Sequence, residues 1–123
     1  MSDLEVHALT VSLFQSNCFF LGKAGQREVI VVDPGDNAGE ILAAIKRENR
    51  QPVLYLLTHG HVDHVYALSE VVSALPAPVA MHPADAAWAF TDRAAFPPYY
   101  GPPAPPPQGI TRDLADGQVW TDV

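Results

Sequence analysis

The chain has 123 residues, of which 48% are apolar and 17% are charged, the balance of a folded domain rather than a disordered segment. Its formal charge of −7 argues against nucleic acids and anionic membrane surfaces as partners, because both bind basic protein faces. A single cysteine excludes an intrachain disulfide, and no apolar run approaches the ~18 residues of a membrane helix. The acidic N-terminus is unlike a signal peptide, so these features together favour a soluble, cytoplasmic domain.

The first part of the chain has the pattern of strands followed by a helix. Three segments rich in apolar or β-branched residues predict strands: residues 6–13, residues 18–21 and Glu28–Val32. The sequence Asp33–Asp36 (D-P-G-D) then predicts a tight turn. Asn37, three residues before Glu40, predicts a capping box at the start of a helix that Pro52 ends.

The next part of the chain alternates strands and helices. Residues 53–57 form an apolar run typical of a strand that is buried on both faces. Apolar residues at helical spacing predict a second helix over residues 65–75, and Val79–Met81 predicts a short strand. Pro83 begins a third predicted helix that runs through Trp88. This alternation predicts an α/β (α+β) architecture built in layers.

The composition divides the chain, predicted as one partial domain over residues 1–123, into three parts. Residues 1–96 form the predicted compact βα region. Residues 97–107 contain seven of the twelve prolines and predict an extended connector, because proline cannot donate a backbone hydrogen bond. Residues 108–123, with a short apolar segment at Val119–Trp120, are expected to start an incomplete second half.

A histidine-rich motif, T-H-G-H-V-D-H at residues 58–64, directly follows the apolar strand. In extended backbone the side chains of His59 and His61 project to the same side, while Asp63 and His64 approach from the next helix. The motif lies at the C-terminal end of a predicted buried strand, the usual place of sites in α/β proteins. Imidazole and carboxylate ligands suit Zn²⁺, Fe²⁺ or Mn²⁺, so the motif predicts a metal site.

The sequence resembles the metallo-β-lactamase superfamily, and within it the glyoxalase II-like hydrolases (hydroxyacylglutathione hydrolase-like). Four segments carry the resemblance: Ser16–Leu21 (S-N-C-F-F-L), Val31–Gly35 (V-V-D-P-G), Leu56–His64 (L-L-T-H-G-H-V-D-H) and Pro78–Asp85 (P-V-A-M-H-P-A-D). The resemblance implies an αββα sandwich with two metals at one edge, of which this chain would form the N-terminal half.

The resemblance also implies roles for individual residues. His59 and His61 would bind a first metal, Asp63 and His64 a second, and Asp63 is the candidate catalytic residue. Asp33 would hold the ligand loop in place. The cofactor would be one or two zinc ions, with iron or manganese as alternatives, and the substrate a small thioester such as an acylglutathione. A hydroxide held by the metals would attack the acyl carbon of that thioester.

Two alternatives remain open because the family takes three further ligands from the second half of its domain, beyond Val123. The chain would then be a truncated, non-catalytic metal-binding half-domain that is completed by a missing C-terminal half or by a homo-oligomer. Alternatively, the same loop would serve an iron-dependent persulfide dioxygenase. Metal content, mass in solution and turnover separate these possibilities from the hydrolase.

Several residues outside the motif have simple structural interpretations. Cys18 is predicted to be a buried strand residue, because free cysteine is among the most buried residue types. His82 is expected to cap the third helix, Asp85 to interact with its dipole, and Trp88 to lie in the core. Tyr100 belongs either to a plain connector or to a substrate entrance.

Overall fold

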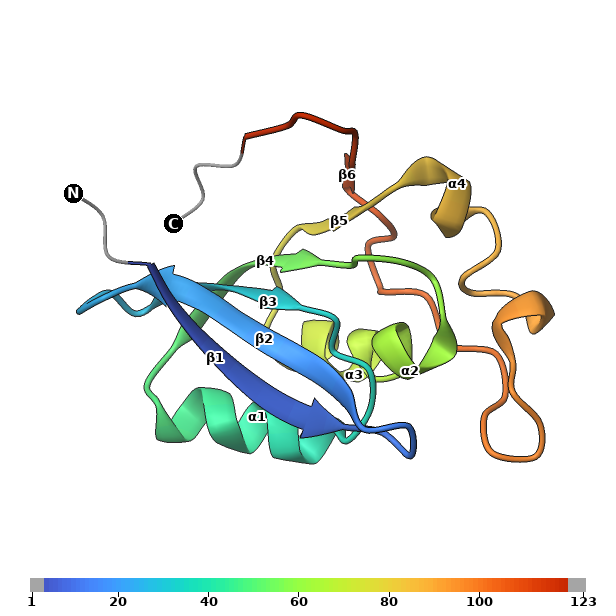
Figure 1. Cartoon of the computed structure of the whole chain (residues 1–123), viewed down its shortest axis with the longest axis horizontal. Helices are drawn as coiled ribbons and strands as arrows, with labels where there is room; N and C mark the ends of the chain where they lie inside the picture. The colour runs from blue at the N-terminus through green and yellow to red at the C-terminus, as the bar shows by residue number, and fades with distance from the viewer. Residues whose placement is uncertain (1–3, 120–123) are drawn as a thin grey trace.

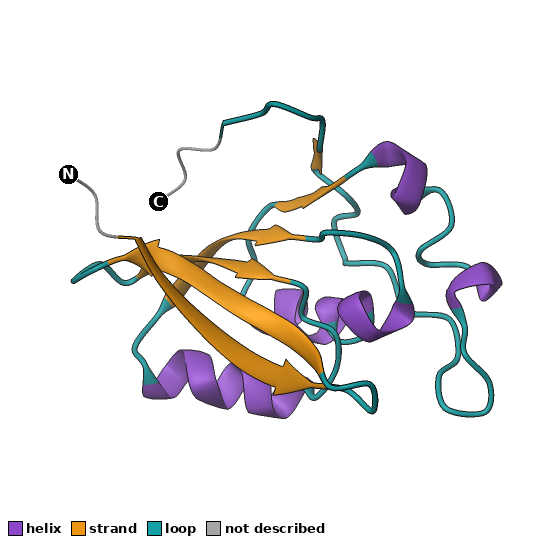
Figure 2. Ribbon diagram, viewed as in Figure 1, coloured by secondary structure: helices purple, strands orange, loops and turns teal. Residues whose placement is uncertain are grey.

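The strand-forming segments combine into one six-stranded sheet in the computed structural model, which describes residues 4–119 (Figures 1 and 2). The strands are β1 (Leu4–Val11), β2 (Ser16–Lys23), β3 (Glu28–Val32), β4 (Gln51–Leu56), β5 (Val79–Met81) and β6 (Arg112–Asp113). The helices are α1 (Ala38–Arg47), α2 (Val62–Val65), α3 (Leu68–Ala74) and α4 (Pro83–Ala86), with a 3₁₀ turn η1 (Asp92–Ala94). This arrangement confirms the predicted α+β class.

The strands lie in the sheet in the order of the sequence, β1 to β6. The pairs β1–β2 and β2–β3 are antiparallel, whereas β3, β4, β5 and β6 run parallel to one another. The carboxyl ends of β3 and β4 therefore meet at one edge of the sheet. In Figure 1, α4 and the loop that follows it lie at this same edge, at the right of the view.

One face of the sheet packs against α1, α2 and α3 (Figure 2). Alternate residues of β2 and β3, including Cys18, Phe20 and Val31, point to this side and pack against Ile41 of α1. The prediction that Cys18 is a buried strand residue is confirmed, since its side chain is 0% exposed. Period-two alternation of the strands and helical spacing in α1 together produce this core.

The opposite face of the sheet is also apolar. Ile30, Val32 and Leu54 form a second buried cluster on this side, and Leu114 packs against it. Towards the β1 edge the same face is open, because Val6 is 59% exposed. Strands that are apolar on both faces are typical of sheets covered by a layer on each side, as in an αββα sandwich.

The first predicted helix has different ends from those expected. Helix α1 ends at Arg47, and Pro52 lies inside β4, so the prediction that Pro52 ends the helix is wrong. Asn37 does precede α1, but its φ of 57° is left-handed and its side chain caps no helical N–H. Instead, Asn37 Oδ1 accepts a hydrogen bond from the backbone N–H of Ser12 at 2.8 Å, so the tertiary contact replaces the capping box.

The second predicted helix is interrupted between α2 and α3. The backbone N–H of Ala67 donates to the carbonyl of Pro34 at 3.2 Å instead of continuing the helical pattern. The turn around Gly35 presses directly against α2, since a Cβ atom there would lie 1.8 Å from the carbonyl oxygen of Asp63. This close approach requires glycine and breaks the helix beside the histidine motif.

The C-terminal part of the described chain contains no helix within residues 97–107, yet it is anchored to the rest of the fold. The Tyr100 side chain is 4% exposed, its hydroxyl donates to Asp36 at 2.6 Å, and it accepts from the backbone N–H of Leu13 at 3.2 Å. The predicted apolar segment at Val119–Trp120 is not a strand at Val119, and Trp120 lies outside the described residues. Within residues 4–119, no helix is long and apolar enough to cross a membrane.

Candidate metal centre

The histidine motif forms the loop from the end of β4 to the first turn of α2, and its four predicted ligands are neighbours there. Two of them, His59 and His64, form a close group of ligand atoms together with Asp33. The rings of His59 and His61 lie 4.7 Å apart, and those of His59 and His64 lie 4.1 Å apart. His64 Nε2 lies 3.3 Å from a carboxylate oxygen of Asp63. His61 is exposed and the other three are half-buried, so the cluster is reachable from solvent.

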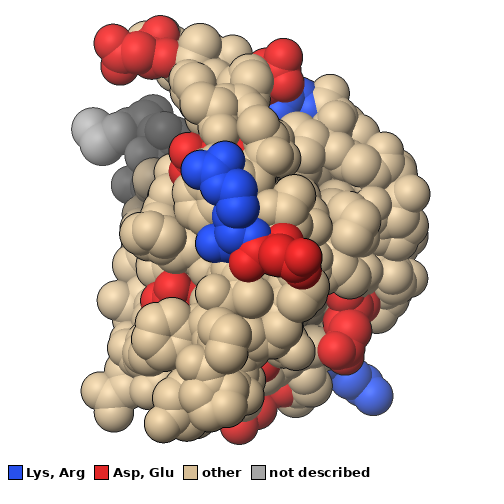
Figure 3. Space-filling view, turned by 90° about the vertical axis from the view of Figure 1, so that its right-hand side faces the viewer, with Lys and Arg blue, Asp and Glu red and all other residues tan. Residues whose placement is uncertain are grey.

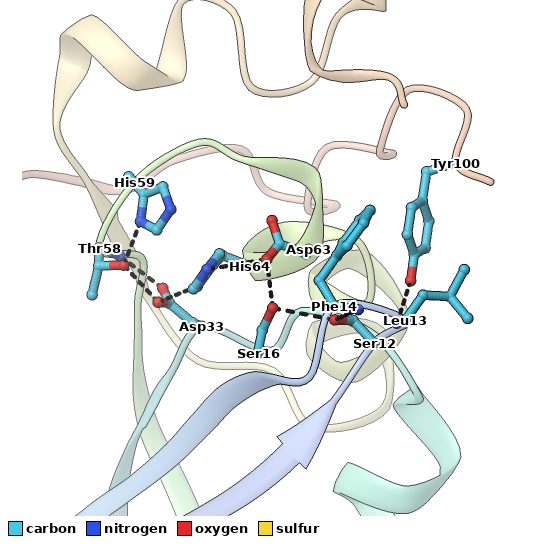
Figure 4. A network of polar contacts seen from close by, with 10 residues as sticks. All are labelled: Ser12, Leu13, Phe14, Ser16, Asp33, Thr58, His59, Asp63, His64 and Tyr100. Atoms are coloured by element: carbon cyan, nitrogen blue, oxygen red, sulfur yellow. Dashed lines mark hydrogen bonds and ion pairs between the residues drawn. The ribbon is translucent and has the colours of Figure 1, made fainter. Parts of the chain in front are cut away.

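Asp33, just after the carboxyl end of β3, contacts His64 directly and His59 through Thr58 (Figure 4). Its side chain is buried, with one oxygen accepting from the backbone N–H of Thr58 at 2.8 Å. The other oxygen accepts from the Thr58 hydroxyl at 2.5 Å and lies 2.8 Å from His64 Nδ1. The parallel pairing of β3 with β4 brings these groups together, because both strands end at the same edge.

This network determines which nitrogen carries the proton in the imidazoles of His59 and His64. The Thr58 hydroxyl has one proton and donates it to Asp33, so its contact with His59 Nδ1 at 2.8 Å requires the histidine to donate. His64 Nδ1 likewise donates to the Asp33 carboxylate. Both rings therefore carry their lone pair on Nε2, which in His64 lies 3.3 Å from a carboxylate oxygen of Asp63. His64, supported through Nδ1 by the carboxylate of Asp33, has the arrangement that metal-binding histidines commonly show.

The electrostatics also favour metal binding. Burial lowers the pKa of His59, and the neighbouring His64 lowers it further, which favours the neutral ring that binds metals. One ligand atom each of Asp33, His59 and His64 lies within 4.8 Å of the others. Both oxygens of Asp33 already accept hydrogen bonds, which suits an orienting role, as the resemblance implied. The donor set as a whole fits a divalent metal ion.

Two further residues of this centre were missed by the sequence analysis or given another role. Ser16, at the start of β2, donates its hydroxyl to Asp63 at 2.5 Å. Asp85 of α4 accepts from the backbone N–H of Gly60 at 2.8 Å, so its charge holds the ligand loop in addition to lying in the first turn of α4. The position of Asp85 just after β5, at the same sheet edge, was the available signal.

Two other expectations near the centre have different outcomes. His82 is the N-cap of α4, and its Nδ1 accepts from the backbone N–H of Ala84 at 3.1 Å, which confirms the predicted cap. Trp88, expected in the core, is only half-buried. Its ring lies 6.0 Å from that of His61, so it belongs to the surroundings of the metal centre.

The comparison with known families agrees with this geometry. The sequence pattern of the Metallo-beta-lactamase superfamily matches residues 11–123. The chain belongs to this superfamily. The resemblance predicted from the sequence motifs is thereby confirmed.

Individual relatives of this metallo-beta-lactamase superfamily member extend the comparison. The hydroxyacylglutathione hydrolase of Klebsiella pneumoniae is 34% identical over 80 residues, which is 65% of this chain and 32% of that protein. The structure of TTHA1623 in a di-iron-bound form has 31% identity and a TM-score of 0.79, covering 93% of this chain and 56% of that one. The BLEG-1 B3 metallo-beta-lactamase, at 24% identity and a TM-score of 0.82, shares the fold.

The matches differ in how much of each relative they include. The chain spans about a third of the length of the curated relatives that it matches. In the two solved structures the matched part is 56% of each chain.

Proposed function

We propose that the protein is a metal-dependent hydrolase that cleaves a thioester of the acylglutathione type. The observation that carries this proposal is the clustering of His59, His61, Asp63 and His64 on one loop at the sheet edge, with the tautomers of two imidazoles set by hydrogen bonds. The relationship to the hydroxyacylglutathione hydrolase of Klebsiella pneumoniae supports the class of substrate.

Each residue of the cluster has a defined task in this proposal. The imidazoles of His59, His61 and His64 and the carboxylate of Asp63 would hold the metal. A metal held there supplies a Lewis acid and lowers the pKa of a bound water towards neutrality. Asp63 also lines the adjacent cavity. We propose that its carboxylate accepts a proton beside the bound substrate.

Zinc is the metal that we propose, and the ligand types admit iron or manganese. Imidazole nitrogen and carboxylate oxygen are common zinc ligands. The di-iron form of TTHA1623 makes iron the main competitor. Metal analysis of protein purified without added metal, followed by reconstitution with each ion in turn, identifies which ion supports turnover.

The test is thioester hydrolysis by the zinc-loaded chain, measured as release of free thiol. We expect a chelator to abolish the reaction and added zinc to restore it. His61→Ala is expected to remove activity, whereas His82→Asn is expected to retain it, because His82 lies outside the cluster and asparagine is a good helix N-cap. A folded, zinc-loaded chain that releases no thiol would contradict the proposal.

A second candidate is metal binding without turnover, in a half-domain that works with a partner chain or as a homo-oligomer. The motif cluster offers four ligand side chains, whereas two catalytic zinc ions need about six protein ligands. Metal content measured together with mass in solution distinguishes the candidates. An inactive monomer with at most one metal favours the half-domain. Oxygen consumption by the iron-loaded protein with a persulfide as substrate favours the alternative of an iron-dependent persulfide dioxygenase.

A further inference from the structure

A cavity of ≈ 380 Å³ lies directly beside the metal centre. His61 and Asp63 form one part of its lining, and the rings of Phe14, Trp88 and Phe96 form much of the remainder. Small-molecule sites are typically concave and apolar, with a few polar groups that fix orientation. This cavity has that character, and it shares two residues with the metal centre.

The aromatic wall is built from two distant segments that contact each other. Phe14 lies in the β1–β2 turn, and its ring meets that of Phe96 edge to face at 5.0 Å. Tyr100 reinforces the contact, with its ring 6.1 Å from that of Phe14 and its hydroxyl bonded to the backbone of Leu13 (Figure 4). The wall is therefore held by ring packing and hydrogen bonds before any ligand binds.

Among the described residues that line the cavity, Arg93 is the only lysine or arginine. Within residues 4–119 its guanidinium makes no hydrogen bond or ion pair. Its backbone is fixed, because the Thr91 hydroxyl accepts from the Arg93 N–H at 3.3 Å and donates to the Trp88 carbonyl at 2.7 Å. The face shown in Figure 3 is largely uncharged, with only a few basic side chains visible.

Arg93 is exposed and adds a positive charge to the cavity lining, in a chain that carries a formal charge of −7. The planar guanidinium matches a carboxylate in geometry and can donate two parallel hydrogen bonds to it. Because Arg93 is exposed, water screens part of this attraction. The chemistry of the lining thus selects a molecule with an apolar body and a carboxylate.

We propose that this cavity binds the carboxylate-bearing part of the substrate, with the apolar body between the rings of Phe14, Trp88 and Phe96 and the carboxylate on Arg93. The preferred substrates are anionic thioesters. This specificity rests on the proposed hydrolase function, and Arg93 is its determining residue. A charge-assisted pair at a partly exposed site corresponds to a preference of about tenfold over an uncharged analogue.

The first test measures binding alone and is independent of turnover. The full chain is titrated with phenylalkyl carboxylates of increasing length and with the matched primary amides, and tryptophan fluorescence is followed. The acid of best-fitting length is expected to bind about tenfold more tightly than its amide. Trp88→Phe is expected to remove most of the fluorescence response, because Trp88 lines the cavity.

Variants show whether Arg93 causes the preference for the acid over the amide. Arg93→Gln is expected to abolish the difference between acid and amide, whereas Arg47→Gln, at an exposed position of α1, leaves it unchanged. Repeating the titration with a chelator distinguishes the contribution of Arg93 to binding of the acid from that of a bound metal. Equal binding of acid and amide overturns the proposal, as does a preference that survives Arg93→Gln and disappears with the chelator.

The second test compares hydrolysis of thioesters that differ only in one carboxylate. The charge is placed at the end of the acyl chain in one pair and on the thiol half in another. At least one carboxylate is expected to raise kcat/KM about tenfold, mainly through KM, and Arg93→Gln removes that gain. If the charged and uncharged thioesters of both pairs are cleaved equally well, the proposed role of Arg93 is wrong, but the hydrolase proposal stands. No cleavage of any thioester contradicts the hydrolase proposal, while the binding test still decides the role of Arg93.

Discussion

The carboxylate of Asp85 accepts a hydrogen bond from the backbone N–H of Gly60 at 2.8 Å, which ties α4 to the loop that carries the metal-ligand candidates. Gly60 lies between His59 and His61 and is packed closely, since a Cβ atom there would lie 3.1 Å from the ring of Trp88. Asp85 of α4 and Trp88, just after α4, therefore both hold the backbone between the two histidines that flank Gly60.

Replacing Asp85 by alanine is therefore expected to weaken metal binding by about tenfold. This is the lower end of the range usually found when a residue that supports a metal ligand is removed. Competition against a chromogenic chelator measures the affinity. The matched control is Asp92→Ala, which removes an exposed carboxylate from η1. If Asp85→Ala and Asp92→Ala bind metal equally well, the positioning role of Asp85 is wrong.

The hydroxyl of Thr58 connects the two histidine supports, because it donates to Asp33 and accepts from His59. Thr58→Val keeps the shape of the side chain and removes both bonds, so His59 is free to adopt the other tautomer. We expect the metal affinity to fall about tenfold. Thr58→Ser keeps the hydroxyl and is expected to retain most of the metal affinity. If Thr58→Val binds metal as tightly as the natural chain, the proposed support of His59 by the Thr58 hydroxyl is wrong.

The four candidate ligands could be predicted from the sequence because they lie within six consecutive residues. Their spacing and the preceding apolar strand were sufficient to place them on one loop. The supporting groups could not be found in this way. Ser16 is 47 residues from Asp63, and Asp85 is 25 residues from Gly60, so both contacts depend on the tertiary fold.

The same reason explains which elements of the fold were predicted correctly. Strands β3 and β5 follow from local alternation and β-branched residues, and their bounds match the prediction. The capping box at Asn37 and the continuous second helix failed because tertiary hydrogen bonds compete with local ones. Asn37 bonds to the turn at Ser12, and Ala67 bonds to Pro34.

Tyr100 links the segment after η1 to the start of α1, because its hydroxyl bonds to Asp36 and to the backbone of Leu13. Tyr100→Phe removes both bonds and keeps the ring, so we expect a loss of about 1–2 kcal/mol in the free energy of unfolding. Urea denaturation provides the measurement. The neighbouring Tyr99→Phe is the control, since Tyr99 is 61% exposed, and an equal loss in both variants contradicts this link.

The last prediction concerns Cys18, which is fully buried in β2 beside the metal centre. Burial, followed by the negative charge of Asp33, raises the pKa of the Cys18 thiol from 9.0 to about 12. Above pH 9 the unfolded chain loses this proton and the folded chain keeps it. The unfolded state then binds fewer protons, so the stability falls as pH rises from 9 towards 12, by up to about 1.4 kcal/mol per pH unit.

Cys18→Ala is expected to remove this part of the pH dependence, although alanine also leaves a small cavity that lowers stability at every pH. The informative quantity is therefore the slope of the unfolding free energy against pH, measured by urea denaturation just above pH 9. In this range Tyr55, another buried group whose pKa is raised, stays mostly protonated in both states. A steeper slope for the natural chain than for the variant supports the prediction, and equal slopes contradict it.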